Sequence, residues 1–324
     1  MSLVARVDRF QRRHPVVGFP IAVLYKFFDD QGPYLAAIMT YYSFIAIFPL
    51  MLIGSSVLGF VLQDDPELQE QLLDTALSQF PIVGDQLGRP GGITGSTSAI
   101  VVGSIAALYG ALGVGQSTQN AANVAWGVPR NSRPNPLMMR LRSVVVLGIG
   151  GLGIGLIAIA QSLADNPELI GLDHLPDLGL VTRVVGLLVT WGIFIMVFKL
   201  VSLRRASWRS VLPGSLFCAL SWQVLQVAGD AYVQRVIVRA SSMNQTFALV
   251  LGLLALLFLL ASSVVIGLEI NVVRRRHLYP RALLTPFTDN VSLTAGDRRA
   301  YAQYARMQRH KGFQTISVDF DEDA

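Results

Sequence analysis

The chain has 324 residues, of which 52% are hydrophobic and only 15% are charged, and its formal net charge is +5. A soluble globular domain usually carries about 25% charged residues, so the composition argues against a water-soluble protein. The apolar segments recur along nearly the whole chain, which favours one membrane domain with short tails over two soluble domains.

Six segments that contain no charged residue predict transmembrane helices. A bilayer core requires about 20 apolar residues in helical form. The fourth segment is shorter, but its terminal charges, Arg183 and Lys199, can extend to the lipid headgroups. The predicted spans are 35–62, 98–122, 143–163, 180–201, 211–232 and 247–271.

Helices are expected because a lipid-exposed backbone must satisfy its own hydrogen bonds, which only a helix or a closed barrel achieves. Barrel strands alternate apolar and polar residues, whereas residues 249–265 are apolar on every side. The predicted fold class is therefore all-α: a polytopic membrane protein with six transmembrane helices and interfacial amphipathic helices.

Three regions are expected: a cytoplasmic or interfacial arm at 1–34, the transmembrane domain at 35–273 and a cytoplasmic tail at 274–324. In the arm, residues 19–28 begin with Pro20 and predict an interfacial helix on the cytoplasmic face. Apolar residues at helical spacing predict an outer amphipathic helix at about 65–80, either a lid packed on the bundle or a mobile, membrane-bending element. The tail is predicted to form a helix near 297–310.

The distribution of lysine and arginine predicts that both termini are cytoplasmic. With six spans both termini lie on one side, and the 26 lysines and arginines fall on that side except Arg89, Arg183, Arg235 and Arg239. The positive-inside rule places this side in the cytoplasm of a bacterial plasma membrane. We therefore attribute the basic balance to topology and to anionic lipid headgroups as partners, and we expect no nucleic-acid partner.

Polar side chains within the spans are the candidate functional residues. Such groups usually face the bundle interior and often mark a substrate pathway; the alternative is interhelical hydrogen bonding that only holds the bundle together. The candidates are Gln116, Asn120, Asn123, Gln223, Gln226, Asp230, Glu269 and Asn271.

The cytoplasmic ends of the second and sixth spans are predicted to meet. Gln116, Asn120 or Asn123 would then lie near Glu269 or Asn271, because both sets lie at the same depth. A buried carboxylate needs hydrogen bonds or a counter-charge, which the amides of the second span could supply. Lys199 or Arg205 in the neighbouring loop would serve equally.

The sequence predicts no metal site, no cofactor and no enzyme activity. The histidines are scattered without the spacing of metal ligands, and no nucleophile elbow or P-loop occurs. Gly148, Gly150 and Gly153 match a dinucleotide fingerprint by letter, but the apolar run continues through Ala160. We interpret these glycines as positions of close helix approach.

Several short motifs, taken in chain order, resemble the YihY/BrkB family of membrane proteins. They are AAIMTYYS at 36–43 with FPL at 48–50, YGA at 109–111 with Asn120 and Trp126, VLPG at 211–214 after Trp208, and GLEIN at 267–271. The set covers most of the chain. It departs from the family at 257–260, where Phe258 and leucines replace the usual Trp and Tyr.

The resemblance implies a six-helix bacterial inner-membrane protein from a family linked to serum resistance and to export of envelope lipid or lipopolysaccharide. The family was once labelled ribonuclease BN, but this chain lacks a His/Asp metal cluster for phosphodiester cleavage. The first hypothesis is transport or translocation of an envelope lipid or other amphipathic substrate. The alternative is a non-transporting scaffold or regulator of envelope assembly. A homo-oligomer is compatible with either.

Overall fold

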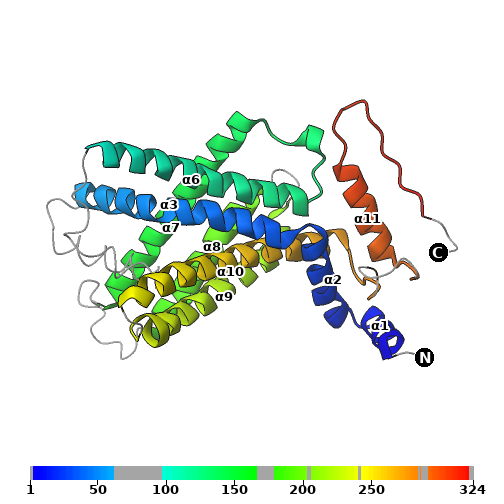
Figure 1. Cartoon of the computed structure of the whole chain (residues 1–324). Helices are drawn as coiled ribbons and strands as arrows, with labels where there is room; N and C mark the ends of the chain where they lie inside the picture. Colours follow the sequence, from blue (N-terminus) through cyan, green and yellow to red (C-terminus); the bar gives the residue numbers. More distant parts are fainter. Residues whose placement is uncertain are drawn as a thin grey trace.

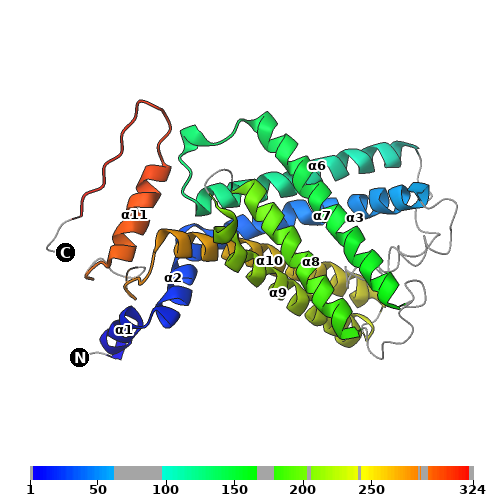
Figure 2. The ribbon, with the colours of Figure 1, turned by 180° about the vertical axis from the view of Figure 1, so that it is seen from behind.

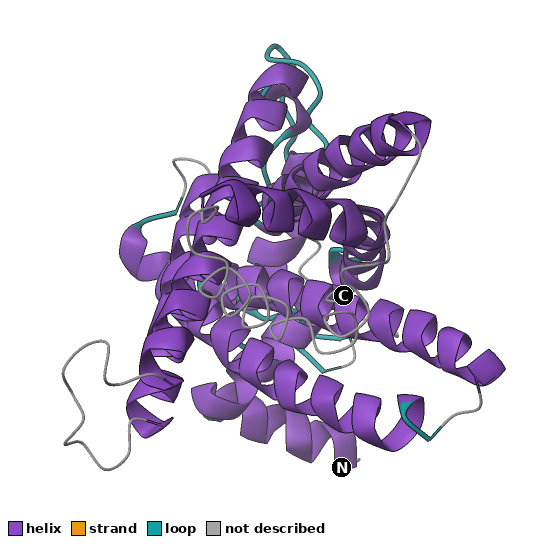
Figure 3. Cartoon of the chain, turned by 90° about the vertical axis from the view of Figure 1, so that its left-hand side faces the viewer, coloured by secondary structure: helices purple, strands orange, loops and turns teal. Residues whose placement is uncertain are grey.

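The structure is a computed structural model that describes residues 3–61, 97–165, 179–202, 206–239, 242–283, 285 and 291–320. Within these residues every regular element is a helix (Figure 3). The predicted all-α class is therefore confirmed. The outer amphipathic helix predicted at 65–80 lies outside the described residues.

Six long helices follow the six predicted spans. They are α3 (Gly32–Val61), α6 (Thr97–Ala125), α7 (Pro136–Asp165), α8 (Gly179–Val201), α9 (Trp208–Tyr232) and α10 (Ser242–Arg276). Most ends lie close to the predicted boundaries. The main difference is that α7 begins before the predicted 143, so that Arg140 and Arg142 lie within its first turns.

Four helices of the described chain are long and apolar enough to cross a membrane. The qualifying segments are Pro136–Ile159, Arg183–Val201, Trp208–Ile237 and Gln245–Arg276, and α3 contributes a shorter apolar segment, Gly32–Ile47. The third segment includes η4 (Val233–Ile237), a π-helical turn that continues α9. These lengths match the thickness of a bilayer core, so the chain has the helices of a membrane protein.

The six long helices form a closed ring. α3 packs on α6, α6 on α7, α7 on α8, α8 on α9 and α9 on α10, and α10 returns to pack on α3. Figures 1 and 2 show opposite sides of the bundle, with α3 and α6 nearer the viewer in the first and α7 and α8 in the second. Each helix therefore packs on its neighbours in the chain.

The outward faces of the ring are apolar. Val144 and Leu152 on α7, Met196 on α8, Val224 on α9 and Leu251 on α10 are all exposed. A soluble protein rarely exposes large contiguous apolar surface. In a membrane these exposed apolar side chains can contact lipid tails, which are as apolar as leucine.

Close helix approach occurs at one of the three glycines that the sequence indicated and also at Gly214 on α9. A Cβ atom on Gly214 would lie 1.9 Å from the carbonyl oxygen of Gly267, so α9 and α10 touch there through backbone. On α7 only Gly153 meets a neighbour, Ile193 of α8, whereas Gly148 and Gly150 have no atom within 4 Å of such a Cβ. The prediction of close approach was therefore wrong for these two positions within the described chain.

Three short helices lie beyond one end of the bundle, which we call the α11 end (Figure 1). They are α1 (Leu3–Arg13), α2 (Pro15–Asp29) and α11 (Ala295–Met307). The predicted tail helix is confirmed, and Thr294 and Asp297 form a capping box at its start. For α2 the predicted start was wrong, because Pro15 rather than Pro20 occupies the first turn.

Candidate functional site

One cluster of charged side chains is buried where α2 meets α10. Lys26 on α2 donates to Asp30, which follows α2 directly, and its Nζ lies 3.4 Å from Oε2 of Glu269 on α10. No side chain of the three is more than 1% exposed. Residues four apart lie on one face of a helix, so α2 presents Lys26 and Asp30 together. The cluster holds two carboxylates for one ammonium.

Burial and the neighbouring charges shift the pKa of Lys26 in opposite directions, and the same is true of the pKa of Asp30. Burial alone would lower the pKa of Lys26, but attraction to Glu269 and Asp30 outweighs it and raises that pKa. Burial raises the pKa of Asp30, and the ammonium of Lys26 opposes this shift. Lys26 therefore stays charged. The unfavourable free energy of the cluster comes from burying a second carboxylate beside a single ammonium.

A second network fixes α11 to α2. Arg281 follows α10 and is 1% exposed; its Nε donates to Asp297 at 2.5 Å, and its Nη2 lies 3.1 Å from a carboxylate oxygen of Asp29. The hydroxyl of Tyr304 on α11 donates to the same oxygen at 3.2 Å. Burial raises the pKa of the Tyr304 phenol, so that it remains a neutral donor. One guanidinium thus joins α2 to the start of α11.

A third set of hydrogen bonds joins α11 to the end of α6. Gln303 donates to the carbonyl oxygen of Ala125 at 3.2 Å and accepts from Arg276 at 2.9 Å, while Arg276 donates to the carbonyl of Trp126 at 2.7 Å. The last carbonyls of a helix have no partner within it, and here α10 and α11 supply donors to α6. The indole of Trp126 in turn donates to Ser202 after α8.

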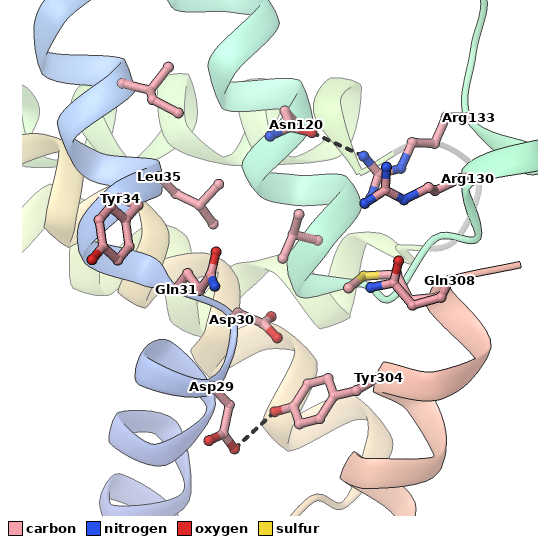
Figure 4. A pocket seen from close by; sticks show the side chains of 13 residues that line it. Asp29, Asp30, Gln31, Tyr34, Leu35, Asn120, Arg130, Arg133, Tyr304 and Gln308 are labelled. Atoms are coloured by element: carbon pink, nitrogen blue, oxygen red, sulfur yellow. Dashed lines mark hydrogen bonds between the residues drawn. The ribbon is translucent and has the colours of Figure 1, made fainter. Parts of the chain in front are cut away.

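A cavity of about 590 Å³ opens between these elements. Ligand pockets typically enclose about 300–1,000 Å³, so its size suits a small molecule or part of a larger one. Its walls come from the end of α2, the start of α3, the second half of α6, the segment after α6, and α11 (Figure 4). The lining residues are Asp29, Asp30, Gln31, Tyr34, Leu35, Ile38, Asn120, Val124, Arg130, Arg133, Tyr304, Met307 and Gln308.

Two arginines form one wall of the cavity. Arg130 belongs to the short helix η1 (Arg130–Ser132), and Arg133 follows it; in Figure 4 both extend toward Asn120. Arg133 donates to the amide oxygen of Asn120 at 3.1 Å and to the carbonyl of Val128 at 3.4 Å. Neither arginine forms an ion pair with any described residue. Burial, together with the charge of Arg130, lowers the pKa of Arg133.

The predicted contact between the second and sixth spans has a different form. α6 does pack on α10, but no hydrogen bond among the described residues joins the candidate amides of α6 to Glu269 or Asn271. Glu269 instead meets Lys26, and Asn271 accepts from the backbone N–H of Gly214 on α9 at 2.8 Å. The proposed donor Lys199 donates to the carbonyl of Ala206, so Lys26 provides the counter-charge that we assigned to the loop.

The candidate polar residues separate into three groups. Asn120 lines the cavity, while Asn123 is buried and Gln116 half-buried on α6. Glu269 and Asn271 are buried on α10.

The third group lies on α9, apart from the other two. Gln223 and Asp230 are exposed and Gln226 is half-buried. For Gln223 the expectation of a side chain that faces the bundle interior was therefore wrong.

Sequence reasoning missed the residues that build the α11 end. Lys26, Asp29 and Asp30 were assigned to an interfacial arm, and Arg130 and Arg133 were used only as topology markers. The spacing of four between Lys26 and Asp30 in an apolar segment was an available signal. Among the described residues, no group of three or more His, Cys, Asp or Glu could hold a metal ion.

The helices and their apolar outer faces define a helical membrane protein. The model of the Virulence factor BrkB family matches residues 23–288, and the chain belongs to this family. It is similar to the Inner membrane protein YhjD of Escherichia coli (strain K12), with 22% identity over 269 residues, which cover 77% of this chain and 79% of that protein. No solved structure matches the chain. The family match includes the second half of α2, with Lys26, and Glu269, but it ends before α11.

Proposed function

We propose that the protein binds an envelope lipid or another amphipathic substrate at the α11 end and translocates it. The observation that carries this proposal is the pair Arg130 and Arg133, which line a cavity without an acidic partner among the described residues. Guanidinium groups form strong, often bidentate hydrogen bonds with phosphate. A phosphate-containing headgroup would supply the negative charge that this wall lacks.

In this proposal α3 and α6 also cross the membrane, which gives six spans, and the α11 end is cytoplasmic. Support comes from the cation asymmetry of the sequence and from the positive-inside rule. Both termini lie beyond the same end of the bundle (Figure 1), as an even number of crossings requires. Ser132 is exposed at this end. A cysteine placed there should resist an impermeant thiol reagent applied outside intact cells, and labelling from outside would contradict the topology.

The cavity is proposed to bind its substrate without chemical conversion. It lies at the end of the bundle and reaches no deeper on α3 than Ile38. It would therefore receive a headgroup at the membrane interface, before the substrate crosses. Lipids are the proposed partners, and a second copy of the chain is a further one.

A scaffold role is the second candidate function. The observation that favours it is the dense pairing at the α11 end, where Arg276, Arg281 and Gln303 join α2, α6, α10 and α11. Such a rigid end would suit a surface that organises other proteins of the envelope. A scaffold needs no movement of lipid, so lipid transfer by the purified protein separates the two functions.

The test uses the full chain reconstituted into vesicles that contain an acyl-labelled phospholipid. Transfer between leaflets is followed by chemical quenching of the outer leaflet. Arg133→Ala should slow transfer roughly tenfold, because hydrogen bonds to charged groups contribute about 1.5–3 kcal/mol. The matched control is Arg140→Ala, an exposed arginine outside the cavity. Vesicles in which the wild-type protein moves no lipid would favour the scaffold.

A further inference from the structure

The wall of the cavity opposite the arginines is acidic. In Figure 4 the carboxylates of Asp29 and Asp30 lie below the two guanidinium groups, with the cavity between them. The side chain of Asp29 is 24% exposed, so it remains accessible from the cavity. The two walls therefore carry opposite charge and are contributed by different elements.

The acidic wall holds more carboxylates than cations. The wall itself contains Asp29 and Asp30. Asp30 shares Lys26 with Glu269, and Asp29 shares Arg281 with Asp297, so that among the described residues two cations serve four carboxylates.

One acceptor of this wall has no protein donor. Oδ2 of Asp30 accepts from Lys26, whereas its Oδ1 is buried and receives no hydrogen bond from any described residue. Since burial raises the pKa of Asp30, an incoming cation would stabilise its ionised form. The acidic wall thus fits a ligand that brings a positive charge and N–H donors.

An apolar strip leads away from the cavity along α3. Tyr34 and Ile38 line the cavity and are exposed, Tyr34 by 71%, and Tyr41 is exposed one turn further. Spacings of four and three residues place all three on one face of the helix. A ligand with acyl chains could lie against this strip while its headgroup occupies the cavity. A soluble ligand would leave the strip unused.

We infer that the cavity recognises a lipid headgroup of the phosphoethanolamine type, with its phosphate at Arg130 and Arg133 and its primary ammonium at Asp29, beside the buried carboxylate of Asp30. The inference rests on the proposed function and names the substrate class of the same site. A primary ammonium has three N–H donors for the carboxylates. A trimethylammonium group has none and prefers aromatic cages, whereas the ring of Tyr304 already faces Lys26, at 5.2 Å.

The first test measures headgroup binding by the purified full chain in detergent, through the shift of its thermal unfolding midpoint. The probes are glycerophosphoethanolamine, glycerophosphoglycerol, glycerophosphocholine and inorganic phosphate. A ligand that binds only the folded state raises Tm, and glycerophosphoethanolamine should raise it most. A rise as large with glycerophosphoglycerol, glycerophosphocholine or inorganic phosphate would overturn the inference.

Variants locate the two ends of the ligand. Arg133→Ala should abolish the shift with every probe, whereas Asp29→Asn should reduce the shift with glycerophosphoethanolamine to that with glycerophosphoglycerol. Asp29 also holds Arg281 and Tyr304, so the comparison is made between probes within each variant. Arg140→Ala should leave all shifts unchanged. If a folded Asp29→Asn variant kept the preference for the amine, the acidic wall would not be its site.

The second test distinguishes this inference from the proposed function. Vesicles contain acyl-labelled phosphatidylethanolamine, phosphatidylglycerol or phosphatidylcholine, and transfer is compared at equal protein. Phosphatidylethanolamine should move about tenfold faster than the others. Equal transfer of all lipids would retain the function and refute the headgroup assignment. A selective Tm shift without transfer would retain the assignment and refute translocation.

Discussion

The polar residues of α10 and those of α9 resemble each other in sequence but lie in opposite surroundings. Glu269 is fully buried and lies within 3.4 Å of Lys26. Gln223 and Asp230, which follow an equally helical spacing on α9, are exposed. The difference arises from neighbours: α10 packs on α2, α3, α6 and α9, whereas α9 packs on α8 and α10 among the long helices.

This comparison shows that a polar residue in an apolar helix does not by itself locate a functional interior. A buried charge on Glu269 destabilises the fold unless it is paired, so neighbouring residues must supply a counter-charge such as Lys26. A polar side chain on an outer face can instead meet water, headgroups or another protein. Substitutions in each region should therefore differ in their effect on the stability of the protein.

The largest effect is expected at Lys26. Lys26→Met removes the only cation that the described chain places beside two buried carboxylates. It should lower the free energy of unfolding by about 3–5 kcal/mol, as expected when a buried ion pair loses one partner. Chemical unfolding of the purified protein in detergent measures this change. Lys311→Met, at an exposed lysine of the tail, is the matched control and should change stability by less than about 0.5 kcal/mol.

A second substitution tests whether charge or packing explains that loss. Adding Glu269→Gln to Lys26→Met removes the excess carboxylate and should recover part of the stability, because fewer unpaired charges then remain buried. If the double variant lost as much free energy of unfolding as the two single variants together, Lys26 and Glu269 would act independently and would not be energetically coupled. Glu269→Gln alone should lower the free energy of unfolding only slightly, because it leaves Lys26 paired with Asp30.

A smaller effect is expected at the backbone contact beside Asn271. Gly214→Ala places a Cβ 1.9 Å from the carbonyl oxygen of Gly267, so α9 and α10 must separate, at a cost of about 1–3 kcal/mol. Gly155→Ala is the control, since nothing lies within 4 Å of its Cβ. There the better helix propensity of alanine should add up to about 1 kcal/mol. Equal effects on the unfolding midpoint would mean that the α9–α10 contact is loose.

The α11 end should lose stability at alkaline pH. Burial raises the pKa of Tyr304 above its ordinary 10.0, and the pKa of Lys26 is raised above 10.5. Groups whose folded pKa is raised stabilise the protein below their unfolded pKa, and the stability is lost as pH rises. The unfolding midpoint should therefore hold up to about pH 10 and fall above it. Tyr304→Phe should weaken this fall, and an unchanged profile would exclude Tyr304 as its source.

The helices of this fold could be predicted from sequence because they depend on local composition. Uncharged segments long enough for a bilayer predicted α3 and α9 with ends close to those observed. The cavity could not be predicted, because its walls come from Asp29, Arg133 and Tyr304, which are far apart in the chain. Glu269 was recognised as a buried carboxylate, but its partner lies near the opposite end of the chain, on a helix whose packing no local pattern reveals.

The smallest effect is expected on the outer face of α9. Gln223 is exposed and makes no hydrogen bond with the described chain, so Gln223→Leu should change the free energy of unfolding by less than about 0.5 kcal/mol. Asn271→Leu is the contrasting variant, because it removes the acceptor of Gly214 and should cost about 1–3 kcal/mol. Light scattering after size exclusion adds a second readout. If Gln223→Leu dissociated an oligomer, a second copy of the chain would cover α9, and its exposed polar face would be an interface between subunits.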